Sequence, residues 1–227
     1  MDQIIECGND SLLLCGLHTC GNLGVDILKL FLTSQKAQLL CYVSCCYHLI
    51  NGNEAFPLSK LLCNRNYTLS RNARMLAAQS LERNSKSSPS KGIFYRSLLQ
   101  IILDDHGISY NYLSNNNENV GKIAPKCADF KEYVRKALTK LDVNIDISDS
   151  VIDNYYSMYS HCEAKVNAFQ YLRTLIAPCI EALLLMDRLV FLLEQPEIQD
   201  AYLMQIFDPL KSPRCIALIA KKNHYTH

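Results

Sequence analysis

The chain has 227 residues, of which 49% are hydrophobic and 20% are charged, and its formal net charge is +1. This length allows one large domain with its own core, and the composition excludes an intrinsically disordered chain. The near-neutral charge does not indicate a nucleic-acid-binding surface. The first residues are acidic rather than a signal peptide, and charged residues interrupt the apolar run Ile176–Leu193. We therefore expect an intracellular protein, in the cytoplasm or nucleus, with no membrane span.

The first predicted element is a strand at Leu12–Cys15, an apolar run that ends at Gly16. A run of this kind is typical of strands buried on both faces in parallel sheets. His18, Thr19 and Cys20 would then form the loop after the strand, where open α/β sheets bind their ligands. The alternative is an ordinary strand-to-helix turn with a polar cap, and the spacing alone favours it.

A helix and a second strand follow this loop. Residues 23–34 carry apolar side chains at helical spacing and predict an amphipathic helix that ends near Thr33–Ser34. Gln38–Ile50 is apolar and rich in β-forming residues, and predicts a strand. Strand, helix and strand with short connections predict two parallel strands. The two polar ends, His18–Cys20 and Cys45–His48, should therefore lie on one rim of the sheet.

The middle of the chain predicts helices separated by polar loops. The helices are expected at Arg71–Arg83, Ile93–Leu103, Phe130–Leu141 and from Ser148 through Tyr159, and the loops at Asn84–Lys91 and Ser114–Asn119. The basic residues of the third helix favour a solvated face over a phosphate site; they are Lys131, Arg135, Lys136 and Lys140. The tyrosines of the fourth favour core packing over a base-stacking surface; they are Tyr155, Tyr156 and Tyr159.

The last part of the chain returns to α/β character. Pro178 suits the first turn of a helix, and Ile180–Leu193 is apolar nearly all round, which predicts a buried helix. Tyr202–Phe207 and Cys215–Ala220 then predict two strands, and their short connection favours an antiparallel pair.

Eleven cysteines occur without any Cys-x-x-Cys pair. Because several lie in apolar runs and no secretion signal is present, we expect reduced, buried thiols and assign no metal ligand. A zinc site remains the alternative, since the rim would bring metal-binding side chains together; they are His18, Cys20, Cys45, Cys46 and His48.

Several short segments, in one order, resemble the methyltransferase-like protein 25 family. They are Gly16–Gly21, Cys45–Leu49, Phe56–Ser59, Arg71–Met75, Phe94–Arg96, Val120–Ile123, Ala177–Glu181, Phe207–Pro209 and Lys211–Cys215. The family is similar to seven-strand, S-adenosylmethionine-dependent methyltransferases, and this chain resembles only its C-terminal part.

The resemblance implies a fold class and a division of the chain. It implies the C-terminal half of a Rossmann-like class I methyltransferase sheet with a large helical insert, mostly helical overall. Within a partial methyltransferase domain over residues 1–227, the strand-helix-strand unit would cover 11–50, the insert 56–178, and the last helix with the closing strands 179–221.

The resemblance also implies an acceptor site on the rim. Its catalytic side would be the loop after the first strand, with His18, Thr19, Cys20 and Asn22, and its substrate side Cys46, Tyr47 and His48. Asn22 stands where the family pattern has aspartate, which removes a carboxylate. The acceptor stays open among a protein side chain, an RNA base and a small molecule; nothing indicates a membrane partner.

The cofactor machinery is what this sequence lacks. No G-x-G-x-x-G occurs anywhere in it, although such a loop commonly holds the cofactor of this fold. We therefore expect a methyltransferase portion whose binding of S-adenosylmethionine is doubtful and which is inactive alone. The alternative is a non-catalytic binding or scaffold module derived from a methyltransferase.

Overall fold

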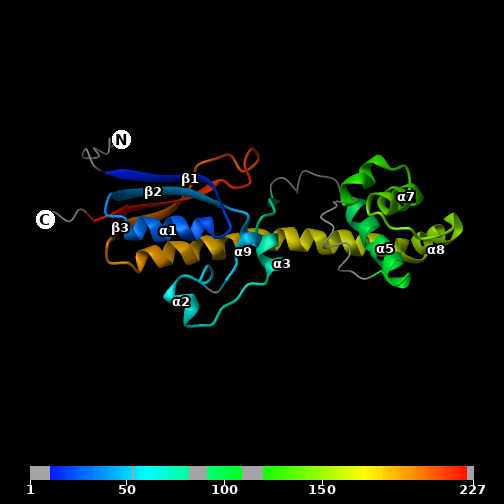
Figure 1. Ribbon diagram of the computed structural model, residues 1–227, viewed down its shortest axis with the longest axis horizontal. Coiled ribbons are helices and arrows are strands. Elements are labelled where there is room, and N and C mark those ends of the chain that lie inside the picture. The colour runs from blue at the N-terminus through cyan, green and yellow to red at the C-terminus, as the bar shows by residue number, and fades with distance from the viewer. Residues whose placement is uncertain (1–10, 53, 82–90, 109–119, 224–227) are drawn as a thin grey trace. The chain divides into compact units, whose positions relative to one another are not determined.

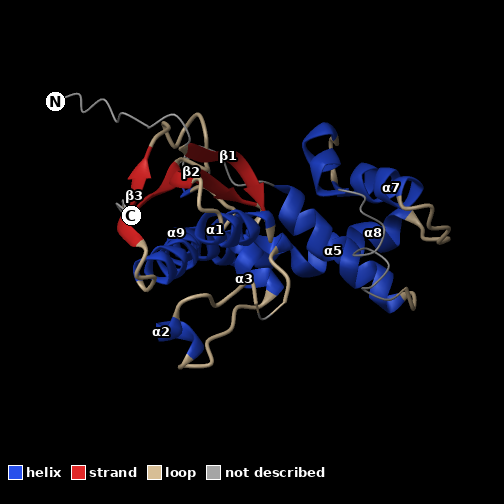
Figure 2. Cartoon of the chain, turned by 60° about the vertical axis from the view of Figure 1, so that its left-hand side comes forward, coloured by secondary structure: helices blue, strands red, loops and turns tan. Residues whose placement is uncertain are grey.

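The computed structural model describes residues 11–52, 54–81, 91–108 and 120–223. The chain divides into two compact units, one formed by residues 1–86 with 173–227 and the other by residues 87–172. The first unit holds a sheet and its helices, and the second is helical (Figures 1 and 2). The expected mixed α/β class is therefore confirmed. None of the described helices is both long enough and apolar enough to cross a membrane.

The described residues form a four-stranded sheet with the order β1-β2-β4-β3. The strands are β1 (Leu12–Cys20), β2 (Ala37–Cys45), β3 (Ile198–Gln205) and β4 (Ile216–Lys222). β1 and β2 are parallel and are connected by α1 (Leu23–Thr33), whereas β4 is antiparallel to both of its neighbours. The predicted strand-helix-strand unit and the antiparallel closing pair are both confirmed.

β1 is longer than predicted and does not end at Gly16. It continues to Cys20, so His18, Thr19 and Cys20 belong to the strand and not to a loop. The pairing of β1 with β2 is irregular between Gly16 and Thr19, where the register shifts. Beyond this irregularity the pairing resumes, with Thr19 opposite Ser44 and Cys20 opposite Cys45. The Thr19 hydroxyl then donates a hydrogen bond of 2.9 Å to the Val43 carbonyl of β2.

β2 is shorter than predicted and ends at Cys45 rather than Ile50. Cys46 adopts a left-handed backbone with φ of 50°, which an extended strand cannot accommodate. A single turn of 3-10 helix, η1 (Tyr47–Leu49), follows it. A chain reversal within the apolar run therefore separates Cys46, Tyr47 and His48 from the strand.

One face of the sheet is covered by α1 and by the C-terminal part of α9 (Glu163–Leu193). Leu28 and Phe31 of α1 and Leu192 of α9 share one core cluster with side chains from β2 and β4. On β2 and β4 these side chains are Ala37, Leu40, Tyr42, Leu218 and Ala220. Figures 1 and 2 show both helices along this sheet.

The opposite face of the sheet is exposed along its two edge strands, β1 and β3, contrary to the prediction that the first strand is buried on both faces. Leu13 is 52% exposed, and Tyr202 and Met204 are each 45% exposed. Cys15 is also exposed, so the prediction of buried thiols fails there, although it holds for Cys45. Among the described residues β1 pairs only with β2, so its outer edge is unpaired as well.

α9 differs from the predicted last helix in two ways. It begins at Glu163 and runs through Pro178, which was expected in its first turn. Its apolar side chains are not all buried: Met186 and Leu193 are exposed, whereas Asp187 and Arg188 are buried. Long-range polar contacts explain this orientation, since Arg188 donates to the Ser44 hydroxyl of β2.

The Asp187 carboxylate anchors the segment that leads into α2 (Lys60–Cys63). It accepts hydrogen bonds from the backbone N–H of Leu58 at 2.8 Å and of Ser59 at 2.9 Å, and from the Ser59 hydroxyl at 2.6 Å. Ser59 in turn caps α2, since its side chain accepts from the Leu62 N–H. One buried charge therefore organises a loop that lies 128 residues away in sequence.

α3 spans only Arg71–Leu76, whereas the sequence predicts a helix to Arg83. The carbonyl of Ala77, just beyond its end, accepts a hydrogen bond from the Arg214 guanidinium. In a longer helix this carbonyl would accept a hydrogen bond from a backbone N–H of the next turn, but here it accepts from Arg214 instead. Residues 82 and 83 lie outside the described part of the chain.

The helical unit has its own core and contains the other predicted helices close to their expected bounds. Its elements are α5 (Lys91–Asp105), η2 (Val120–Lys126), α7 (Phe130–Lys140), α8 (Asp149–Tyr159), η3 (Ser160–Cys162) and the start of α9. Tyr155, Tyr156 and Tyr159 pack against this core, as predicted. Lys131, Arg135 and Lys136 each pair with an acidic side chain. The predicted loop at Asn84–Lys91 lies outside the described residues except for Lys91, which begins α5. The predicted loop at Ser114–Asn119 lies outside them entirely.

We predict that Asp187→Asn lowers the free energy of unfolding by about 3 kcal/mol, because the amide replaces a buried charge that accepts three hydrogen bonds. Urea unfolding followed by circular dichroism measures this change. Glu194→Gln, in the turn just after the end of α9, is the matched control, since its contact with the Lys60 N–H is exposed and its loss should cost less than about 1 kcal/mol. Equal effects of the two substitutions would contradict the anchoring role.

Candidate functional site

The rim at the carboxyl ends of β1 and β2 is the candidate site. The two strands are parallel and pair Cys20 directly with Cys45, so both strand ends lie on one edge of the sheet. The Gly21 N–H donates to the Cys45 carbonyl at 3.1 Å and extends this pairing into the next loop. The sequence-based prediction that the two polar segments share one rim is confirmed.

Three of the predicted catalytic residues have different surroundings. His18 is exposed on β1. Thr19 is only 3% exposed, and its hydroxyl is occupied by the Val43 carbonyl. Asn22 does not cap α1 with its side chain; instead its amide donates to the Asn51 carbonyl at 2.9 Å, and its oxygen accepts from the Asn51 N–H at 2.8 Å. Thr19 therefore ties the two strands together, and Asn22 ties together the loops that follow them.

Three thiols meet at the centre of the rim. The Sγ atoms of Cys20, Cys45 and Cys46 all lie within 4.8 Å of one another, and the Cys20 and Cys45 sulfurs are 3.0 Å apart. Burial and the neighbouring thiols raise the pKa of Cys45 from 9.0 to about 12. Burial also raises the pKa of Cys46, although the Arg214 charge opposes this. At neutral pH both thiols are protonated in the absence of a bound cation.

The segment after β2 turns Tyr47 inward and leaves His48 half-buried. Tyr47 is 1% exposed, and its hydroxyl donates to the Glu181 carboxylate of α9 at 2.9 Å. Burial first, and the Glu181 charge next, raise the pKa of this phenol, so it stays protonated. The Nδ1 atom of His48 is buried without a hydrogen-bond partner. Of the two rim histidines, His48 has the less satisfied ring.

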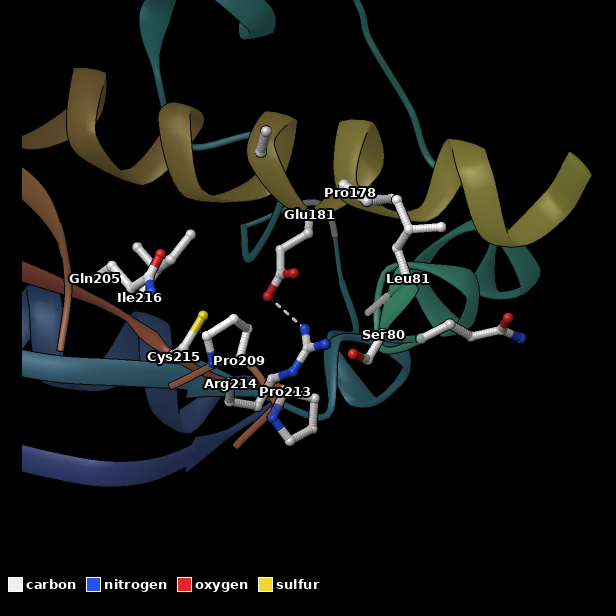
Figure 3. A pocket seen from close by; sticks show the side chains of 12 residues that line it. Ser80, Leu81, Pro178, Glu181, Gln205, Pro209, Pro213, Arg214, Cys215 and Ile216 are labelled. Carbon is white, nitrogen blue, oxygen red and sulfur yellow. Dashed lines mark hydrogen bonds and ion pairs between the residues drawn. The ribbon is translucent and has the colours of Figure 1, made fainter. Parts of the chain in front are cut away.

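A cavity of about 170 Å³ lies beside Tyr47. Its lining comes from α9, from the loop between β3 and β4, and from the residues after α3 (Figure 3). Figure 3 shows the Arg214 guanidinium and the Glu181 carboxylate facing each other in it, and the two form an ion pair. The Arg214 guanidinium carbon also lies 5.5 Å from the centre of the Tyr47 ring.

Glu181 and Arg214 were not predicted as site residues. A signal was present, because Glu181 is one of the few charges in the apolar run Ile176–Leu193. Their side chains are only 17% and 9% exposed, and a charge so deeply buried needs a partner. Chemically, the site offers two histidines, three thiols and a buried ion pair, while the hydroxyls of Thr19 and Tyr47 are engaged in holding the fold.

We predict that Arg214→Met lowers the free energy of unfolding by about 3 kcal/mol, because it removes the cationic partner of the buried Glu181 carboxylate and the hydrogen-bond donor to the Ala77 carbonyl. Urea titration provides the measurement. The control is Lys29→Met, an exposed cation of the same unit, whose loss should change stability by less than about 0.5 kcal/mol. A neutral effect of Arg214→Met would contradict the proposed importance of the pair.

The thiols should differ in reactivity. In reduced, chelator-treated protein at pH 8, iodoacetamide should modify the exposed Cys15 at least tenfold faster than Cys45, which is buried and has a raised pKa. Mass spectrometry of timed digests measures both rates. Repeating the reaction in urea is the control, because unfolding should bring the two rates together. A fast reaction of Cys45 in the folded chain would contradict the geometry of the rim.

The comparisons with known proteins agree with the sequence-based resemblance. A family model described as a methyltransferase domain matches residues 3–53. The chain is 38% identical, over 238 aligned positions and 98% of its length, to the probable methyltransferase-like protein 25 of Mus musculus. It is 39% identical, over 92% of its length, to the probable methyltransferase-like protein 25 of Homo sapiens.

The coverage of these relatives is partial. The chain spans 39% of the Mus musculus protein and 37% of the Homo sapiens protein. No solved structure matches the chain. Over nearly all of its own length, the chain is thus similar to methyltransferase-like protein 25 of these two organisms.

Proposed function

We propose that this chain forms the C-terminal, acceptor-side part of an S-adenosylmethionine-dependent methyltransferase and does not transfer a methyl group by itself. The observation that carries the proposal is the sheet: its parallel strands end at one polar rim, while, within the described residues, the β1 edge is unpaired and one face of both edge strands is exposed. Leu13 and Leu17 of the edge strand are 52% and 56% exposed. Sheets with parallel strands are normally covered on both faces. Apolar surface of this kind favours a part of a larger fold.

The fit of the cofactor to these residues is poor. Gly21 and Gly24 are the only described glycines spaced like part of a nucleotide-binding loop. A Cβ on Gly21 would lie 2.7 Å from the Leu49 Cβ, and one on Gly24 would lie 3.3 Å from Nη1 of Arg188. Both glycines therefore pack against the chain itself, and their backbone N–H groups already donate to the Cys45 and Gly21 carbonyls. The described residues fit an acceptor site and do not fit the cofactor.

Methyl transfer asks the protein for alignment of the reactants and removal of a proton from the acceptor. The rim contains groups suited to the second task. His48 carries a buried Nδ1 without a hydrogen-bond partner, and a neutral imidazole has one ring nitrogen that can accept a proton. We assign proton removal to His48 and contacts with the acceptor to His18, Cys20 and Cys46, with Thr19, Asn22 and Tyr47 as positioning residues.

An intracellular location, in the cytoplasm or nucleus, is part of this proposal. All ten cysteines in the described residues are free thiols, even where two sulfurs lie 3.0 Å apart. Free thiols at this density suit a reducing compartment.

A non-catalytic binding or scaffold module is the second candidate. The observation in its favour is the separate hydrophobic core of the helical unit, in which Phe94, Tyr95, Phe130 and Tyr133 are almost fully buried. A unit with its own core can be retained for contacts with a partner after catalysis has been lost.

Calorimetric titration of the 227-residue chain with S-adenosylmethionine, and with its demethylated product, tests the proposal. We expect no heat of binding from a chain that circular dichroism shows to be folded. The full-length Mus musculus relative, titrated in the same buffer, is the positive control and should bind both. Saturable one-to-one binding by the 227-residue chain would overturn the proposal that its residues do not hold the cofactor.

A further inference from the structure

The structure brings together three thiols that the sequence keeps apart. Cys20 ends β1, Cys45 ends β2 and Cys46 is the next residue, yet their Sγ atoms all lie within 4.8 Å of one another. The parallel register explains the first pair, because Cys20 and Cys45 are direct partners across the two strands. The third thiol requires a different explanation.

Cys46 joins the group because its backbone is left-handed. In an extended strand, Cys45 and Cys46 would point to opposite faces of the sheet. The φ of 50° at Cys46 interrupts this alternation and lets both thiols approach Cys20. A non-glycine residue with a positive φ is uncommon and is often part of a functional site. The strain at Cys46 therefore serves to assemble the third thiol.

The geometry points to a zinc ion held by the thiolates of Cys20, Cys45 and Cys46, and we propose this site as a second property of the rim. Zinc–sulfur bonds of about 2.3 Å in a tetrahedron separate the sulfurs by about 3.8 Å. The observed limit of 4.8 Å, with one pair at 3.0 Å, can reach this arrangement through side-chain rotation. Thiolates are also the ligands that select zinc over magnesium or calcium.

The fourth position of this site is open. Among the described residues, neither His18 nor His48 has a ring nitrogen within the group of mutually close ligand atoms. Three protein ligands with an exchangeable fourth are the arrangement of zinc sites that bind water or a substrate. Cys20 and Cys46 are half-buried rather than enclosed, which leaves an entry path for the ion.

This proposal differs from the sequence-based preference for metal-free thiols and from the five-residue alternative considered there. The spacing of the cysteines contained no Cys-x-x-Cys pair, so it did not favour zinc. Strand register and one left-handed residue supply the convergence that spacing does not reveal. The proposal concerns this chain's own residues and does not depend on cofactor binding.

Titration of the reduced, chelator-treated 227-residue chain with Co²⁺ tests the site. We expect a near-ultraviolet thiolate-to-cobalt band that saturates at one equivalent and disappears when Zn²⁺ is added. Competition with a chromophoric chelator then measures the zinc affinity. Cys20→Ser and Cys46→Ser should each remove about a third of the band and weaken zinc binding at least tenfold, as loss of a metal ligand requires.

Cys15→Ser and Cys63→Ser are the matched controls, because both thiols are exposed and lie outside the cluster. They should leave the band and the affinity unchanged, and circular dichroism should show every variant folded. A folded chain without a saturable band would overturn the proposal, as would a band that survives Cys20→Ser and Cys46→Ser. A Cys20–Cys45 disulfide in air, with no metal uptake after its reduction, would overturn it too.

Discussion

Parallel pairing of β1 with β2 is the constraint on which the rest of this molecule depends. Because α1 returns the chain to the start of a neighbouring strand, the carboxyl ends of both strands lie on one rim. The register then fixes which side chains meet there, since Cys20 is opposite Cys45. A shift of one residue would turn every side chain of a strand to the other face. Two hydrogen bonds between Asn22 and Asn51 extend this control to the loops.

The polar side chains of the rim divide into those that hold the structure and those that remain available for chemistry. Thr19, Asn22 and Tyr47 use their hydrogen-bonding groups on the fold itself. Tyr47 depends on Glu181, which depends in turn on Arg214, so α9 and the loop before β4 reach the rim through one chain of contacts. Since buried polar groups are costly when unpaired, this chain limits how the rim can rearrange.

Local patterns in the sequence were sufficient where local forces decide the structure. The apolar repeat of residues 23–34 predicted a helix that ends near Thr33–Ser34, and α1 ends at Thr33; short connections predicted the strand directions correctly. Predictions failed where a distant residue decides. Pro178 did not start a helix, because α9 passes through it, and α3 ended early where Arg214 takes the Ala77 carbonyl. Local patterns assigned no structural role to Asp187 and Arg188, and both are buried against partners more than 120 residues away.

The same distinction between local and distant contacts explains the thiol cluster, and the sizes of the free energies involved favour a bound ion there. A left-handed backbone at a residue with a side chain costs about 1–2 kcal/mol. A hydrogen bond between two thiols, such as Cys20 and Cys45, is too weak to offset this cost with a margin. Zinc bound by cysteine thiolates contributes about 10 kcal/mol or more to small domains. The strain at Cys46 is therefore small beside the free energy that a bound ion supplies, and an ion at this position would also tie β1 to the turn after β2.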